Sequence, residues 1–238
     1  KGHNMKALLL NGPGKPFSIE TIEDPTPQKG YAVAKVLACG SGLTIQHVKA
    51  GRITVNYPRI IGHEIIGEIV EINGHGGDLE IGTPVTAFFY LTCGHCRWCN
   101  IDRETLCDNF RGYIGREIDG GYAEYIKLPI ENFIKIPEEI DYKNNLLETA
   151  VVCDAVATPL KIIKKARISS FDKVGVIGAG GGLGIHMLKM LKLNNISAIG
   201  IDTKTEKFNT CNESGAEFSV SPMAVSYTHL TLPTNGTV

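Results

Sequence analysis

Short apolar runs broken by turn residues mark the first part of the chain, up to about residue 140. The runs lie at 5–10, 31–38, 65–72, 84–90 and 121–129, and Gly, Pro or Asn residues flank them. Apolar runs of this length between turn residues are typical of β-strands. We therefore expect a compact, mostly antiparallel barrel or sandwich in this part of the chain.

The pattern changes near residue 143, where longer apolar stretches with helical spacing begin. Pro159 should start or kink a helix there, because proline disrupts a helix interior. Farther on, "KVGVIGAGGGLG" runs from an apolar strand into a glycine turn, and Leu183, Met187 and Leu191 are expected on one helical face. With the following "ISAIGID", this pattern predicts a strand–helix–strand unit and an α/β fold class overall.

The two ends of the chain depart from these patterns. Residues 224–238 are rich in threonine and lack periodicity, where a strand–helix–strand fold should continue. We interpret them as a non-native tail, with native sequence ending near Met223; a genuine polar tail is the alternative. The "KGHN" ahead of Met5 is interpreted as foreign in the same way.

Composition excludes several classes of partner. The 238 residues carry a formal net charge of −1 without a basic run, so neither nucleic acid nor an anionic membrane is expected as a partner. No apolar stretch reaches the length of about 18 residues that a membrane span needs. The odd number of cysteines and the absence of a signal-peptide pattern favour a reducing compartment, which predicts a cytoplasmic protein.

Four of the seven cysteines fall in one short stretch, "CGHCRWCNIDRETLC". Cys93, Cys96, Cys99 and Cys107 have the spacing C-x2-C-x2-C-x7-C. Thiolates at such spacing converge on one ion, and four of them form the usual closed structural zinc site. A ferredoxin loop would have a shorter last spacing followed by proline, and disulfides between cysteines this close would be strained. We expect a structural zinc without catalytic chemistry; clustered free thiols are the alternative.

The glycine turn predicts a dinucleotide site, because it lies between a predicted strand and a predicted helix. Gly181 and Gly182 would let the backbone approach a pyrophosphate at the helix N-terminus, and Gly184 would allow close packing of helix on strand. Asp202 ends the next strand, where a carboxylate would bind ribose hydroxyls and repel a 2′-phosphate, which favours NAD over NADP. Lys207 completes the expected cofactor-binding set, and a glycine turn without a ligand is the alternative.

Four motifs occur in one order: the cysteine loop, "GHE" at 62–64, "GGYAEY" at 120–125 and the glycine turn. Together, over about residues 5–222, they resemble the zinc-dependent medium-chain alcohol dehydrogenases. The resemblance implies a GroES-like β-barrel domain over 5–158, with the structural zinc lobe at about 90–112. It also implies an incomplete NAD-binding Rossmann domain with a parallel sheet over 159–223.

The resemblance also assigns candidate catalytic residues. His63 matches a ligand of the family's catalytic zinc, and Glu64 matches the carboxylate beside it. Thr44 and His47 match the hydroxyl and the imidazole that relay the alcohol proton to solvent.

The family's ligand set is not complete in this sequence. Gly42 stands at the position of the ligand cysteine, Ile45 stands at that of the following aspartate, and Cys39 is expected to face elsewhere. The remaining ligand position could fall on Asp154 or on Cys153. A catalytic zinc is therefore doubtful, with His63, Glu64, Asp154 and Cys153 as the residues that could hold one.

These features predict an NAD-dependent oxidoreductase that interconverts a small-molecule alcohol with a ketone or aldehyde. Two alternatives stay open: a zinc-free reductase of the same fold and a non-catalytic NAD-binding relative. The resemblance implies a homo-oligomer for the complete protein. The chain supplies two or three of about six Rossmann strands, so we expect it to be inactive without the nicotinamide half.

Overall fold

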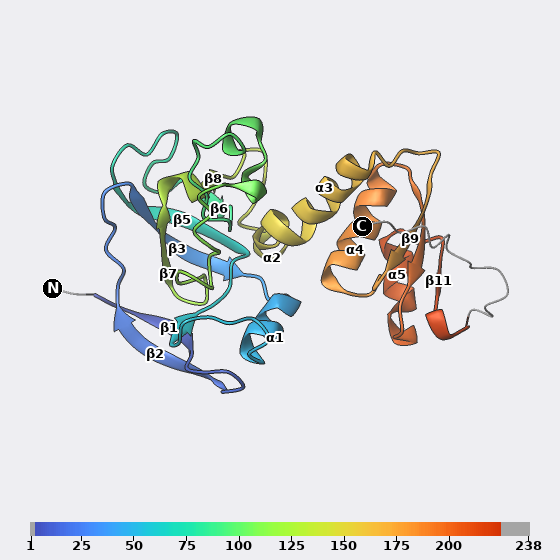
Figure 1. The fold of residues 1–238 in the computed structure, drawn as a ribbon, viewed down its shortest axis with the longest axis horizontal. Coiled ribbons are helices and arrows are strands. Elements are labelled where there is room, and N and C mark those ends of the chain that lie inside the picture. The colour runs from blue at the N-terminus through green and yellow to red at the C-terminus, as the bar shows by residue number, and fades with distance from the viewer. Residues whose placement is uncertain (1–2, 225–238) are drawn as a thin grey trace. The chain divides into compact units, whose positions relative to one another are not determined.

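The computed structural model describes residues 3–224 of the chain (Figure 1). The chain divides into two compact units, Lys1–Asp154 and Ala155–Val238. The residues interpreted above as a foreign tail lie, from residue 225 on, outside the described residues.

The first unit is built mainly from strands. Its strands are β1 Asn4–Leu10, β2 Phe17–Glu23, β3 Tyr31–Cys39, β4 Arg59–Ile60, β5 Ile65–Asn73, β6 Pro84–Ala87, β7 Tyr125–Pro129 and β8 Phe133–Lys135. Its helices are α1 Leu43–Lys49 and α2 Leu146–Ala150, with 3-10 turns η1 Cys99–Ile101, η2 Glu104–Leu106 and η3 Ile130–Asn132. A π-helical turn, η4 Val152–Val156, follows α2 and spans the boundary to the second unit.

Two antiparallel sheets form this unit, with strand orders β2-β1-β4 and β7-β3-β5-β6-β8. The segment that leads into β7 joins them, because Leu8 of β1 donates its N–H to the carbonyl oxygen of Tyr122 at 2.8 Å and Val36 of β3 donates to that of Glu124 at 2.9 Å. Ile65, Ile69 and other alternate residues of the five-stranded sheet fill its core. The mostly antiparallel architecture that the strand pattern predicted is confirmed.

The second unit is a strand–helix–strand arrangement. Its elements are α3 Ala157–Ala166, β9 Lys173–Ile177, α4 Gly182–Leu193, β10 Ser197–Ile201, η5 Thr205–Lys207, α5 Phe208–Ser214, β11 Phe218–Val220 and η6 Pro222–Ala224. The strands pair in parallel in the order β11-β10-β9, which confirms the α/β fold class. Pro159 lies in the first turn of α3, directly after the π-helical turn η4.

The buried face of α4 differs from the predicted one. Leu188 and Leu191 are fully buried and Met187 packs against the same core, but Leu183 is 51% exposed. Gly184 takes the buried position in the first turn instead. Of the three residues predicted on one helical face, Leu183 does not reach the core, whereas Gly184 does, because the close approach of helix and glycine turn leaves no space for a Cβ at Gly184.

Candidate functional site

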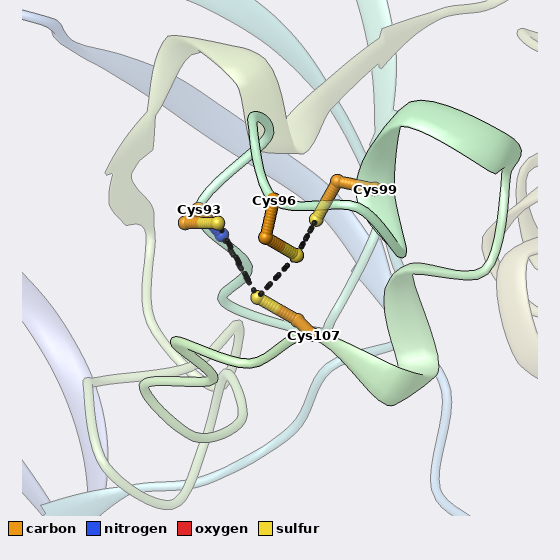
Figure 2. A group of neighbouring side chains, drawn as sticks. All are labelled: Cys93, Cys96, Cys99 and Cys107. Atoms are coloured by element: carbon orange, nitrogen blue, oxygen red, sulfur yellow. Dashed lines mark hydrogen bonds between the residues drawn. The ribbon is translucent and has the colours of Figure 1, made fainter.

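The four cysteines of the loop converge (Figure 2). Their ligand sulfur atoms all lie within 4.8 Å of one another, with 3.5 Å between those of Cys96 and Cys99 and 3.6 Å between those of Cys107 and Cys93. The 3-10 turns η1 and η2 fold the loop back, so that ligands at its two ends meet. Four thiolates at this separation suit the tetrahedral coordination of Zn²⁺ and leave no position open for substrate.

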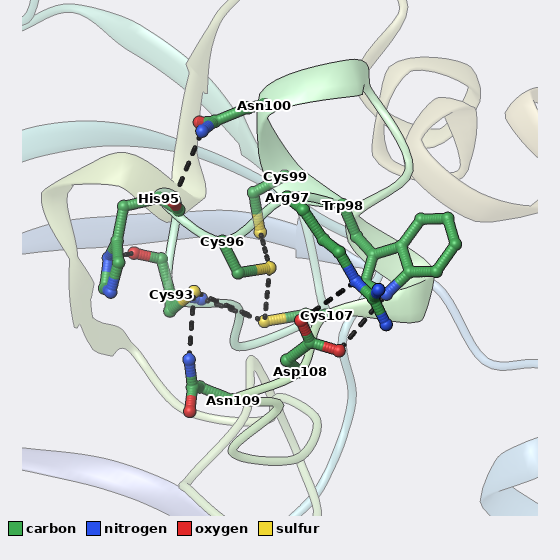
Figure 3. Close-up of polar contacts among 10 residues, drawn as sticks. All are labelled: Cys93, His95, Cys96, Arg97, Trp98, Cys99, Asn100, Cys107, Asp108 and Asn109. Atoms are coloured by element: carbon green, nitrogen blue, oxygen red, sulfur yellow. Dashed lines mark hydrogen bonds and ion pairs between the residues drawn. The ribbon is translucent and has the colours of Figure 1, made fainter.

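The surroundings of the loop favour thiolates at its rim (Figure 3). A hydrogen bond from the backbone N–H of His95 is the main cause that lowers the pKa of Cys93 to about 6. Cys99 differs, because burial raises its pKa to about 11. Asp108 accepts from the indole nitrogen of Trp98 at 3.1 Å and thereby holds the two sides of the loop together.

The "GHE" segment connects β4 with β5 in a conformation that requires its glycine. Gly62 has φ of +95°, and a Cβ placed there would lie 2.7 Å from the ring of Tyr122 and 2.8 Å from the sulfur of Cys39. The two following side chains diverge. His63 is partly exposed toward a cavity, and Glu64 is buried.

A cavity of about 230 Å³ lies beside His63 within the first unit. Its lining residues are Thr44, Ile53, His63, Phe89, Tyr113, Ile114, Arg116 and Asp154. The Nε2 atom of His63 lies 3.2 Å from Oδ2 of Asp154, and the His63 ring packs on that of Phe89 with centroids 4.8 Å apart. Residues far apart in the sequence thus place a hydroxyl, an imidazole, a carboxylate and a guanidinium around one space.

The position of Asp154 depends on packing beyond its own segment. Ala150 and Leu146 of α2 pack with Ile66 of β5, and the π-helical turn η4 then turns the chain toward His63. Such turns are frequent at functional sites. The neighbouring Cys153 instead directs its thiol toward the carbonyl oxygens of His63 and Ala150, at 3.9 and 3.8 Å.

The residues that could complete a catalytic zinc site are not gathered. Within residues 3–224, the cysteine loop is the one group of three or more potential ligands close enough to hold an ion. The carboxylate of Glu64 lies over the 40–42 segment, because a Cβ on Gly40 would be 2.6 Å from its Oε2 and one on Gly42 would be 4.0 Å from it. The sulfur of Cys39 packs against Gly62 and Gly121. His63 and Asp154 therefore fit a zinc ion only as an incomplete pair of ligands.

Helix α1 carries the two residues expected to relay a proton. Thr44 lines the cavity, whereas His47 does not. The Nδ1 atom of His47 lies 3.2 Å from Nη1 of Arg52. Positions three apart on a helix are neighbours, so the two side chains share one face of α1.

The glycine turn of the second unit is closely packed. A Cβ on Gly184 would overlap the Gly178 carbonyl oxygen and would lie 2.7 Å from the backbone of Ala179. The N-terminus of α4 at Gly182 has no heavy atom within 4 Å of an added Cβ, so this face of the turn is open. A phosphate group could approach the backbone N–H groups there.

Asp202 and Lys207 both hold the glycine turn. Oδ2 of Asp202 accepts from the N–H of Gly180 at 2.8 Å, and Nζ of Lys207 donates to the Gly180 carbonyl at 2.8 Å. The pKa of Asp202 is lowered, mainly because its carboxylate accepts a hydrogen bond from the Lys204 N–H. Asp202 is therefore an anion at neutral pH at the end of β10, as an acid that selects against a 2′-phosphate would need to be.

Sequence reasoning did not find the aromatic and cationic wall of the cavity. Phe89, Tyr113 and Arg116 line it, yet each lies in a turn or loop without a recognisable motif. Their role follows only from the fold, which brings residues 113–116 beside Phe89, where Ile114 donates its N–H to the Phe89 carbonyl oxygen at 3.0 Å. None of the helices in residues 3–224 combines the length and the apolar character needed to cross a membrane.

The chain is similar to alcohol dehydrogenases in sequence and in structure. Residues 28–138 match the alcohol dehydrogenase GroES-like domain. An alcohol dehydrogenase of Geobacillus stearothermophilus is 32% identical over 91% of this chain and 63% of its own length. An NAD-dependent alcohol dehydrogenase of Sulfurisphaera tokodaii is 29% identical, over 91% and 64%.

A solved structure agrees with these sequence relatives. The cobalt- and zinc-bound thermostable alcohol dehydrogenase of Pyrobaculum aerophilum superposes with a TM-score of 0.84 and 28% identity, covering 93% of this chain and 67% of that one. The chain thus spans somewhat less than two thirds of the length of the two sequence relatives above. By sequence and by fold, the chain is similar to zinc-binding alcohol dehydrogenases, and its residues 28–138 match their GroES-like domain.

Proposed function

We propose that the whole protein is an NAD-dependent oxidoreductase that interconverts a small-molecule alcohol with a ketone or aldehyde. The observation that carries this proposal is the cavity in which Thr44, His63 and Asp154 meet, on the scaffold of the alcohol dehydrogenase family. Relatives named as NAD-dependent alcohol dehydrogenases support the choice of reaction and of cofactor.

The residues of the chain would divide the work between binding and proton movement. The hydroxyl of Thr44 would hydrogen-bond the oxygen of the alcohol and pass its proton toward His47, one turn along α1. His63, oriented by Asp154, would fix the other side of that oxygen, and Glu64 would remain a buried carboxylate behind the 40–42 segment. When bound, NAD supplies the hydride acceptor, and the protein positions it.

Cofactor binding would use the second unit. Gly181, Gly182 and Gly184 would hold the pyrophosphate at the start of α4, while Asp202 would bind the ribose. Lys207 supports the turn through the Gly180 carbonyl.

Zinc would have a structural role in this protein. Cys93, Cys96, Cys99 and Cys107 would hold one ion that fixes the lobe at about 90–112. The ligands around His63 do not complete a second site, so the proposed proton path uses the side chains alone.

The same proposal assigns residues 5–158 to the GroES-like domain and residues 159–223 to an incomplete NAD-binding domain. A cytoplasmic homo-oligomer without nucleic-acid or membrane partners fits the balanced charge and the family scaffold.

The test uses the full-length protein with NAD and a panel of secondary alcohols, followed by NADH absorbance. Thr44→Val should lower kcat about a hundredfold or more, because the relay hydroxyl is lost, whereas the matched Thr44→Ser should retain most of the rate. Absence of NAD-linked oxidation or reduction with every alcohol and ketone of the panel would contradict the proposal.

A further inference from the structure

Arg116 brings a permanent positive charge to the wall of the cavity beside His63. It follows β6 and the cysteine loop in sequence, in the turn between Tyr113 and Ile118, and its side chain is 30% exposed. Among the cavity-lining residues, all of which belong to the described part of the chain, no other is permanently cationic. A charged guanidinium is costly to hold in a mostly apolar wall unless something pairs with it.

The hydrogen-bonding capacity of this guanidinium is only partly used. The Nε atom of Arg116 is buried and has no hydrogen-bond partner among the described residues. Its nearest acid is Glu117, at 3.9 Å from Nη2, which exceeds hydrogen-bond distance. Glu117 is itself engaged, because its Oε2 accepts from the backbone N–H of Tyr113 at 2.6 Å.

An aromatic ring contacts the guanidinium. The Cζ atom of Arg116 lies 4.6 Å from the ring centroid of Tyr113, which itself lines the cavity. A cation–π contact of this kind holds the charge beside the ring without using the N–H groups of the guanidinium. A planar fork of donors held in this way matches the two oxygens of a carboxylate.

We propose that the substrate of this protein carries a carboxylate and that Arg116 binds it, which makes Arg116 a residue that determines specificity. The proposal rests on the proposed function, since it names the class of alcohol or ketone: a small hydroxy acid or its keto acid. The alcohol oxygen then lies toward Thr44 and His63 while the carboxylate lies toward Arg116, all within the one cavity.

The carboxylate of Asp154 in the cavity favours a substrate with a single negative charge. Asp154 also lines the space, but it is paired with His63 at 3.2 Å. One guanidinium offsets one negative charge, so a phosphate dianion would bring a second charge toward the carboxylate of Asp154 without a partner. A cavity of about 230 Å³ also fits a short hydroxy acid better than a nucleotide-sized ligand.

Binding can be measured on the full 238-residue chain without turnover, because every lining residue belongs to its first unit. The probes are 3-hydroxybutyrate and its methyl ester, which has the same carbon skeleton and no charge. We expect the chain to bind the acid and to bind the ester about tenfold to a hundredfold more weakly, by ligand-observed NMR titration.

Substitutions test whether Arg116 causes the preference for the acid over its ester. Arg116→Met should remove the preference for the acid, and Arg116→Lys should retain part of it because the charge remains while the planar fork is lost. Arg103→Met is the matched control, since Arg103 is exposed and does not line the cavity, and it should behave as the wild type.

Three results would overturn the inference: equal binding of acid and ester, an unchanged preference in Arg116→Met, or stronger competition by inorganic phosphate than by the hydroxy acid. Failure of the proposed function looks different. If the chain prefers the acid but the full-length protein performs no NAD-linked turnover, the carboxylate site stands and the dehydrogenase assignment falls. If the full-length protein oxidises neutral alcohols and acids equally, the assignment stands and the carboxylate site falls.

Discussion

The cysteine loop and the His63 cavity both lie in the first unit and both contain potential metal ligands. Among the described residues, the loop gathers enough ligands for a metal ion and the cavity does not. In the loop, four ligands lie within residues 93–107, and their sulfurs come within 4.8 Å of one another. In the cavity, His63 and Asp154 are separated by 91 residues and meet as a pair. Ligands that are close in sequence are held together by the turns of their own loop. Ligands that are far apart in sequence depend on the packing of whole helices and strands, and the site can no longer bind a metal when one ligand is replaced.

The pKa values of Cys93 in the loop and Cys153 beside the cavity differ. The backbone N–H of His95 lowers the pKa of Cys93 to about 6, so its thiolate forms readily at neutral pH. Burial raises the pKa of Cys153 to about 11, and the charge of Glu64 acts in the same direction. The thiol of Cys153 is also directed toward the carbonyl oxygens of His63 and Ala150, at 3.9 and 3.8 Å, which makes it a poor third ligand beside the His63 ring.

The largest effect is expected when one of the four cysteine ligands of the loop is replaced. Cys96→Ser should abolish tight zinc binding, reducing the purified protein from about one zinc per chain to none, and should lower the free energy of unfolding by several kcal/mol. Metal analysis and thermal unfolding measure the two effects. Cys211→Ala, which removes a buried thiol of the second unit, is the control that should keep its zinc. Unchanged zinc content in Cys96→Ser would show that the loop is a cluster of free thiols.

The next test adds a potential zinc ligand to His63 and Asp154. Gly42 has extended backbone (φ −99°, ψ −175°) that any residue can adopt, and the nearest atom to a Cβ placed there is 4.0 Å away. Gly42→Cys should raise zinc content after gentle chelation from about one toward two per chain, because His63 and Asp154 are already paired nearby.

Ser41→Cys is the control for the Gly42 experiment, since it adds a thiol at the adjacent exposed position. It should leave the zinc content unchanged. Two tightly held zinc ions in the wild type would show that another residue already fills the gap, and the difference between the two regions would disappear.

A moderate effect is expected at Asp202, where the carboxylate both holds the glycine turn and excludes a 2′-phosphate. The full-length protein should bind NAD at least about tenfold more tightly than NADP. Asp202→Asn should narrow this ratio while retaining a hydrogen-bond acceptor for Gly180, and Asp202→Gly should narrow it while also loosening the turn. Equal affinity of the wild type for both cofactors, by fluorescence titration, would rule out this role.

Much of the fold was predictable because its signals are local. The strand–glycine turn–helix pattern gave β9 and α4, and the runs at 31–38 and 65–72 gave β3 and β5 almost to the residue. Strand β2 was missed because its residues are mostly exposed and show no apolar alternation. The run at 84–90 was predicted too long, since the chain leaves the sheet after Ala87 and Phe88 donates its N–H to the carbonyl of Asn132 instead.

The candidate site was less predictable, because its parts are set by tertiary packing. The cysteine spacing alone indicated convergence of four thiols, and the structure brings them together. No spacing rule indicates that Asp154 rather than Cys153 faces His63, since the π-helical turn η4 decides which side chain turns inward. Arg116 could not be found at all, because a single arginine in a turn acquires meaning only from the cavity beside it.

The smallest effect is expected at Tyr142, which ties the segment carrying Asp154 to the barrel. Its hydroxyl donates to Oε1 of Glu68 on β5 at 2.6 Å, and this hydrogen bond is the main cause that raises the pKa of Tyr142 to about 12. Because the folded pKa exceeds the unfolded one, the stabilisation is fully present below about pH 10 and is lost as the pH rises toward 12. Tyr142→Phe should therefore lower the free energy of unfolding by about 1 kcal/mol at neutral pH and should flatten its decline between pH 10 and 12, as measured by urea unfolding.

Tyr31→Phe is the control, since Tyr31 lies on β3 and no side-chain hydrogen bond of its hydroxyl is seen among residues 3–224. Zinc content should remain unchanged in both variants, because the cysteine loop is held by its own turns, and a loss of zinc in Tyr142→Phe would show that the two regions are coupled after all.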